Sequence, residues 1–98
     1  DLITFNKVLE HVIDPISMLS RAKDMLSKCG IVYVEVPDGE CAEAAGPSRE
    51  EFFIDHHHVF SFASLALMAK RASFHPLLIE RLQEPSTKYT LRAFLAVI

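Results

Sequence analysis

The chain is short and mildly acidic: it has 98 residues, half of them hydrophobic and 23% charged, with a formal net charge of −3. This length allows at most one domain, and the balance of apolar and charged residues is that of an ordinary globular protein. The lack of a Lys/Arg cluster argues against a nucleic-acid partner, and no apolar stretch reaches the roughly 20 residues that a membrane-spanning helix needs.

The two cysteines and the first residues bear on the compartment and the completeness of the chain. Cys29 and Cys41 match no zinc-pair spacing and make no disulfide framework, so a reducing cytoplasm is expected. The sequence starts at Asp1 without a methionine or a secretory signal and enters an apolar run at once. We therefore expect a piece of a longer protein.

The first half of the chain predicts a strand, a helix and a second strand. "LITFN" (2–6) is a short apolar and β-branched run, typical of a strand. Asp14 is a good N-cap, Pro15 suits the first position of a helix, and Gly30 is placed to close it. "IVYVEV" (31–36) is almost continuously apolar, as expected of a strand buried in a parallel sheet.

The second half predicts one more helix and an antiparallel pair of strands. A long polar loop covers 38–51, and Ser61 is a plausible N-cap for a helix through residue 72. Extended runs at 77–82 and 88–98 are joined by so few residues that they must pair in antiparallel fashion. The fold class is therefore α/β, with the order β-α-β-α-β-β and a terminal antiparallel hairpin.

Several of these stretches resemble a known family. "VLEHV-DP" (8–15), "VYVEVP" (32–37) and "FFIDHHHVFSFASL" (52–65) are similar to segments of class I S-adenosylmethionine-dependent methyltransferases that act on small molecules. The resemblance implies that residues 1–98 are the second half of a Rossmann-like methyltransferase sheet, a partial catalytic domain from its fourth strand to its last. The cofactor implied is S-adenosylmethionine, and the partner is a small-molecule methyl acceptor.

The resemblance also implies where the cofactor lies. The stretch after the first strand, here Asn6, Lys7 and Val8, resembles the backbone that lines the methionine end of the cofactor. The family's Gly-rich turn has no counterpart among the three glycines of this chain. We therefore expect the 98 residues alone to bind the cofactor poorly and to be inactive.

Three consecutive histidines, 56–58, allow three interpretations. In an extended segment His56 and His58 share a side, but a catalytic zinc site needs three protein ligands, so no metal is expected. Some family members carry a catalytic His five residues before the Ser that opens the next helix, and this spacing selects His56 as general base, followed by His11 and His58. The alternative is that the rings beside Phe60 and Phe62 only pack.

The sequence also suggests roles for two glutamates. Glu10 beside His11 is an alternative base, although a charge in such a loop is expected to be solvated. Glu35 lies inside a strand and needs a partner if it is buried, and Arg92 on the last strand is the expected partner.

Two functions from different classes remain open at this point. The first is methyl transfer to a small molecule, with this chain supplying the substrate side of the cleft. The second is a non-catalytic scaffold or dimerisation remnant of such a domain. Because the first strand would be an apolar edge, the isolated chain is expected to be poorly soluble or to form a homodimer. A nicotinamide-dependent dehydrogenase fits less well, because those sheets usually continue in parallel.

Overall fold

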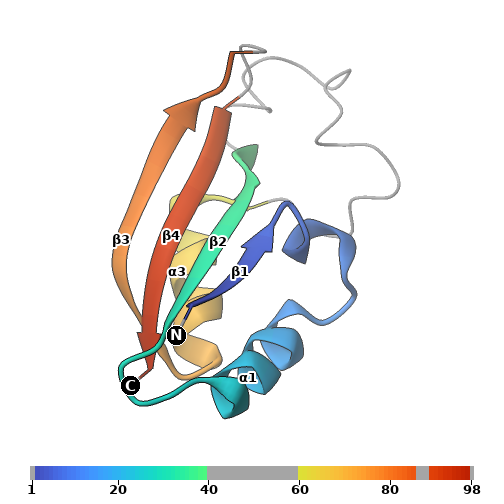
Figure 1. Ribbon diagram of the computed structural model, residues 1–98. Helices are drawn as coiled ribbons and strands as arrows, with labels where there is room; N and C mark the ends of the chain where they lie inside the picture. Colours follow the sequence, from blue (N-terminus) through green and yellow to red (C-terminus); the bar gives the residue numbers. More distant parts are fainter. Residues whose placement is uncertain (1, 40–59, 86–88, 98) are drawn as a thin grey trace.

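The computed structural model describes residues 2–39, 60–85 and 89–97. Within these ranges the elements follow the predicted order (Figure 1). They are β1 (Leu2–Asn6), the 3-10 helix η1 (Leu9–His11), α1 (Pro15–Met25), β2 (Ile31–Pro37), α3 (Phe62–Arg71), β3 (Phe74–Gln83) and β4 (Tyr89–Val97). None of the helices in these ranges is long and apolar enough to cross a membrane.

The four strands form one mixed sheet in the order β1-β2-β4-β3. β1 and β2 are parallel, as the intervening helix requires, whereas β4 runs antiparallel to both β2 and β3. The last strand therefore lies in the sheet between β2 and β3. This arrangement confirms the predicted α/β fold with a terminal antiparallel hairpin.

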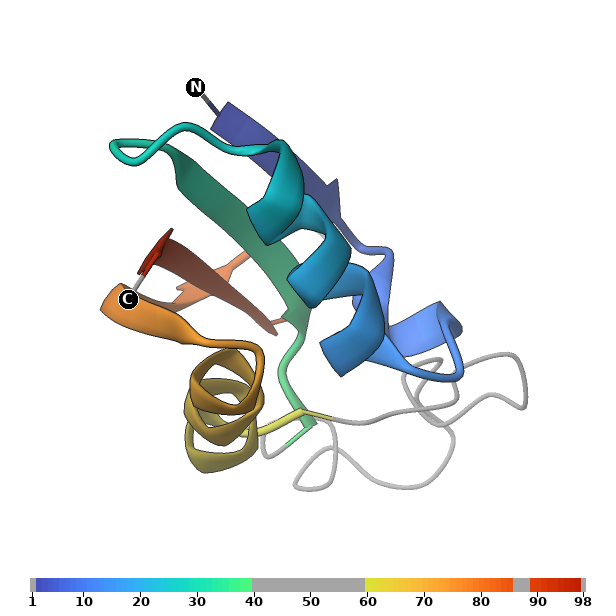
Figure 2. The ribbon, with the colours of Figure 1, turned by 90° about the horizontal axis from the view of Figure 1, so that it is seen from below.

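α1 and α3 cover the same face of the sheet, which Figure 2 shows from below. On β2 the buried and half-buried residues alternate, so that Val32, Val34 and Val36 point toward the helices. β4 adds Leu91, Ala93 and Leu95 to the same layer, all with no exposed surface. The core of the described residues therefore lies between one face of the sheet and the apolar sides of α1 and α3.

The two α-helices start at the predicted residues because their caps satisfy backbone donors. The Asp14 carboxylate accepts the Ser17 N–H at 3.0 Å, and Pro15 occupies the first turn. Ser61 and Ser64 form a reciprocal capping box at the start of α3. The C-terminal end of α1 differs from the expectation, because the helix stops at Met25 and a turn leads on to Gly30.

β3 is longer than the sequence predicted, since it starts at Phe74 and includes Pro76. A proline cannot donate to a ladder, so strands accept it only at edges, at the first residue or at bulges. β3 lies at one edge of the described sheet, opposite β1, where one side of the backbone needs no partner, and the register shifts between Pro76 and Leu78. The proline is therefore accommodated by an edge position and a local irregularity.

The sheet face opposite the helices carries a row of polar side chains, one from each strand. Asn6, Glu35, Arg92 and Glu80 are neighbours in register. Arg92 faces Glu35 as predicted, but its ion pair is with Glu80 on the other side. The partner predicted for Glu35 is thus wrong: it accepts a hydrogen bond from the Tyr33 hydroxyl at 3.0 Å.

Ser73, directly after the C-cap of α3, has a left-handed backbone with φ of 66°. A residue with a Cβ pays roughly 1–2 kcal/mol for this conformation, whereas glycine does not. We expect Ser73→Gly to raise the free energy of unfolding by about 0.5–1 kcal/mol and Ser73→Val to lower it. Urea denaturation of both variants measures the difference, and equal stabilities would contradict the assignment of strain.

Candidate functional site

The carboxyl ends of β1 and β2 lie at the same edge of the sheet. Asn6 at the end of β1 pairs with Glu35 in β2, and the Lys7 N–H donates to the Glu35 carbonyl at 2.8 Å. In open α/β sheets ligands bind outside such carboxyl ends. The edge formed by residues 6–11 and 37–39 is therefore the candidate site, and we call it the carboxyl edge.

Lys7 makes the sharp turn with which the chain leaves β1. Its φ of 58° is left-handed, which is uncommon for a residue other than glycine. The ammonium reaches Glu84 after β3 at 2.9 Å, and Glu84 also accepts a hydrogen bond from the Thr90 hydroxyl. Lys7 thus ties the two sides of the sheet together at this edge, while its backbone turns the following residues away from β1.

η1 places His11 and Glu10 differently, although they are adjacent in the chain. The His11 N–H donates to the Val8 carbonyl at 2.9 Å, and the His11 side chain is 40% exposed. Glu10 is buried, with 2% of its surface exposed. The expectation of a solvated Glu10 is therefore wrong, because the short helix turns this carboxylate inward while it leaves the imidazole outside.

Asp38 is a buried carboxylate at the end of β2 that sequence reasoning did not select. It has no exposed surface and forms an ion pair with Arg81 of β3, whose guanidinium lies 4.9 Å from the centre of the Phe62 ring. The Gly39 N–H donates to the Phe60 carbonyl at 2.7 Å. The signal for Asp38 in the sequence was its place directly after a buried strand, the position where α/β sheets carry functional polar groups.

The predicted site residues divide into two groups. Asn6, Lys7, Val8 and His11 come together at the carboxyl edge, and Val8 is 37% exposed there. His56 and His58 lie outside the described residues, so their predicted role as bases is not tested. Within residues 2–39, 60–85 and 89–97, no three His, Cys, Asp or Glu side chains gather as metal ligands do.

Glu84 makes the stability of this edge depend on pH. The hydrogen bond from Thr90, then that from Lys7, lowers the pKa of its carboxyl below the ordinary 4.5. A lowered pKa in the folded state contributes stability above the ordinary value, and that stability is lost as the pH falls through the folded value. We expect Thr90→Val to flatten the loss of stability below about pH 4.5, as followed by thermal unfolding between pH 3 and 7. An equally steep loss of stability below this pH in Thr90→Val and in the wild type would contradict this prediction.

Comparison with known proteins identifies the family. A family model described as a methyltransferase domain matches residues 1–78, which is most of the chain. The chain belongs to this methyltransferase family. No curated protein matches it.

Solved methyltransferases share the fold at low sequence identity. A Burkholderia thailandensis 1,6-didemethyltoxoflavin N1-methyltransferase, solved with its substrate and S-adenosylhomocysteine, has a TM-score of 0.74 and 20% identity over all of this chain and 44% of its own. A possible histamine N-methyltransferase from Thermotoga maritima gives 0.71 and 18%, covering 96% of this chain and 55% of its own. The O-methyltransferase NcsB1 from neocarzinostatin biosynthesis, solved with S-adenosylhomocysteine and 1,4-dihydroxy-2-naphthoic acid, gives 0.71 and 17%. The match with NcsB1 covers 99% of this chain and 29% of NcsB1.

These matches confirm the resemblance to class I methyltransferases that the sequence indicated. They also show that the chain spans between 29% and 55% of the length of these three proteins.

Proposed function

We propose that residues 1–98 form the substrate side of an S-adenosylmethionine-dependent methyltransferase acting on a small molecule. The observation that carries the proposal is the carboxyl edge of a methyltransferase-family sheet, where residues 6–11 turn away from β1 beside the end of β2. Residues 1–98 are a partial catalytic domain in this proposal, and the activity belongs to the longer protein. The 98 residues alone are inactive, because the family's Gly-rich turn is not among them.

The residues at the end of β1 fit the methionine end of the cofactor. Asn6 is exposed and Val8 is 37% exposed at the carboxyl edge, and the left-handed Lys7 turns the backbone between them. The Lys7 side chain is held by Glu84, so that it braces the turn. When bound, S-adenosylmethionine supplies an electrophilic methyl group on a sulfonium. Asn6, Lys7 and Val8 hold its amino-acid end mainly through the main chain.

His56 removes the proton of the attacking group in this proposal. A neutral imidazole accepts a proton near pH 7, and methyl transfer needs little more than positioning and one such base. His58 is the next candidate, because alternate residues share a side wherever a segment is extended. His11, which is exposed at the carboxyl edge, is the other candidate. The competing interpretation is that the three histidine rings only pack and have no catalytic role.

A small-molecule acceptor is favoured by charge and by the similar structures. The net charge is −3, and the sequence has no Lys/Arg cluster that would attract a phosphate backbone. Two of the similar proteins were solved with small aromatic molecules bound. A 16S rRNA methyltransferase from Catenulisporales acidiphilia also shares the fold, at 7% identity and a TM-score of 0.67, so the fold by itself does not choose the acceptor.

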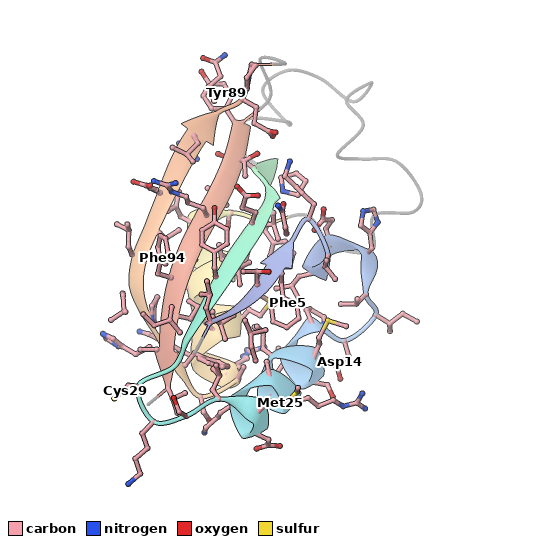
Figure 3. The ribbon with its side chains drawn as sticks, viewed as in Figure 1. Phe5, Asp14, Met25, Cys29, Tyr89 and Phe94 are labelled. Atoms are coloured by element: carbon pink, nitrogen blue, oxygen red, sulfur yellow. The ribbon has the colours of Figure 1, made fainter. Side chains whose placement is uncertain are left out.

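The scaffold alternative predicts an interaction surface and no chemistry. An apolar groove of about 390 Å³ beside β1 is lined by Phe5 and Met25, both labelled in Figure 3. Leu2, on the same edge strand, is 63% exposed. Self-association of the isolated chain through this edge fits both alternatives, since an unpaired apolar strand favours pairing.

The free Cys29 is consistent with the cytoplasmic location that we propose.

Transfer of a labelled methyl group tests the proposal. The full-length protein that contains these residues is incubated with labelled S-adenosylmethionine and two panels, one of phenols, amines and hydroxylated aromatics and the other of RNAs. Label in a small molecule supports the proposal. Label only in RNA would overturn the acceptor class, and no transfer by a folded protein would favour the scaffold.

A further inference from the structure

Glu10 is a buried carboxylate that is 2% exposed. Its Oε1 atom is buried and has no hydrogen-bond partner among the residues that the structure describes. The other oxygen, Oε2, lies 3.7 Å from Nε2 of His11, which is too long for a hydrogen bond. Lys7, the nearest cation along the chain, is directed to Glu84.

Such a group is unfavourable for the stability of the fold. An ionised carboxylate only accepts hydrogen bonds, and burying one without donors costs several kcal/mol unless the group is neutralised. Buried polar groups in native proteins are almost always paired, so an exception calls for a reason outside the stability of the fold. No described residue donates a hydrogen bond to Oε1 of Glu10, and its neighbour Leu9 is a fully buried core residue.

The place of Glu10 supplies that reason. It follows the cofactor turn of residues 6–8 by two positions and stands on η1 at the carboxyl edge, beside the exposed His11. We propose that Glu10 is a recognition residue for the methyl acceptor and accepts a hydrogen bond from an O–H or N–H group of that molecule. This inference rests on the proposed function and deepens it.

The chemistry of the carboxylate restricts the class of acceptor. The ionised form of Glu10 cannot donate, so a ligand of that form has to bring the hydrogen, as phenols, alcohols and amines do and as ethers and fully substituted amines do not. A site built to bind a hydroxyl or amine hydrogen rejects analogues that lack it, since its buried polar group then stays unpaired. Acceptors with a free O–H or N–H are therefore the substrates of this site.

The first test measures stability and needs no acceptor. Glu10→Met keeps the volume and removes the buried charge, while Glu10→Gln keeps the shape and is the second variant. Glu80→Met is the control, since this half-exposed carboxylate has its ion pair with Arg92. We expect Glu10→Met to raise the midpoint of thermal unfolding of the full-length protein and Glu80→Met to lower it slightly. A midpoint lowered by both Glu10 variants would make Glu10 a structural residue and overturn the proposal.

The second test measures selectivity in the full-length enzyme. With a hydroxylated or amine acceptor found by the labelling screen, Glu10→Met is expected to lower kcat/KM about 10- to 100-fold, the usual range for a charged hydrogen bond. S-adenosylhomocysteine affinity stays within about twofold, and Glu80→Met leaves kcat/KM unchanged. An unchanged kcat/KM in Glu10→Met would overturn the recognition role although methyl transfer stands. If the wild type transfers no methyl group, the proposed function fails first, and this inference fails with it.

Discussion

Replacement of His56 by Ala is expected to lower kcat for methyl transfer by about 100- to 10,000-fold, the usual contribution of a positioned general base. The affinity for S-adenosylhomocysteine is expected to stay unchanged, because the base contacts the acceptor and not the cofactor. The effect follows from the spacing that places this His five residues before Ser61, the observed N-cap of α3. Steady-state kinetics with the acceptor found by labelling and calorimetry with the cofactor product give the two values.

His57→Ala is the matched control for this variant. Neighbouring side chains of an extended segment point to opposite sides, so His57 is expected to leave kcat within a few-fold of the wild type. His58→Ala and His11→Ala rank the two remaining candidates. Equal, small effects of all four substitutions on kcat, accompanied by a loss of thermal stability, would show that the histidines pack and do not act as bases.

Replacement of Arg81 by Met is expected to lower the free energy of unfolding by about 3 kcal/mol, because it breaks an ion pair whose carboxylate is buried. Asp38 has no exposed surface, whereas the Arg81 side chain is 34% exposed. Loss of the arginine therefore takes a cation away from a buried carboxylate, and it also removes the contact with the Phe62 ring. Urea denaturation measures the change.

Arg92→Met is the control for this ion pair, since Arg92 and Glu80 are 36% and 34% exposed on the neighbouring strands. An exposed pair of this kind contributes roughly 0–1 kcal/mol. The double variant Arg81→Met/Asp38→Asn is expected to recover more than half of the loss, because its buried carboxylate is neutralised. Equal losses for Arg81→Met and Arg92→Met would contradict the view that burial of Asp38 sets the cost.

Most of the fold was predictable because its signals are local. The continuous apolar run of β2, the Asp14–Pro15 start of α1 and the Ser61 cap of α3 all act within a few residues. The antiparallel hairpin followed from the short connection between β3 and β4, which excludes a parallel return. The edge position of β3 is a property of the whole sheet, and for this reason the run at 77–82 did not show that the strand begins at Phe74 and includes Pro76.

The parts of the site that were not predictable depend on long-range contacts. Asp38 and Arg81 are 43 positions apart, and no local pattern pairs them. Arg92 lies in register between Glu35 and Glu80, and the sequence offers no means of choosing between two carboxylates. The burial of Glu10 depends on a single turn of 3-10 helix that packs its side chain inward, whereas a charge in a short polar stretch is usually solvated.

The cofactor class is the central claim, and calorimetric titration of S-adenosylhomocysteine into the full-length protein that contains residues 1–98 tests it most directly. The carboxyl edge at the end of β1 predicts saturable binding at one site, weakened by Lys7→Pro, which cannot adopt the left-handed backbone of this turn. No heat of binding from a well-folded protein would contradict the claim and leave a methyltransferase fold that serves as a scaffold.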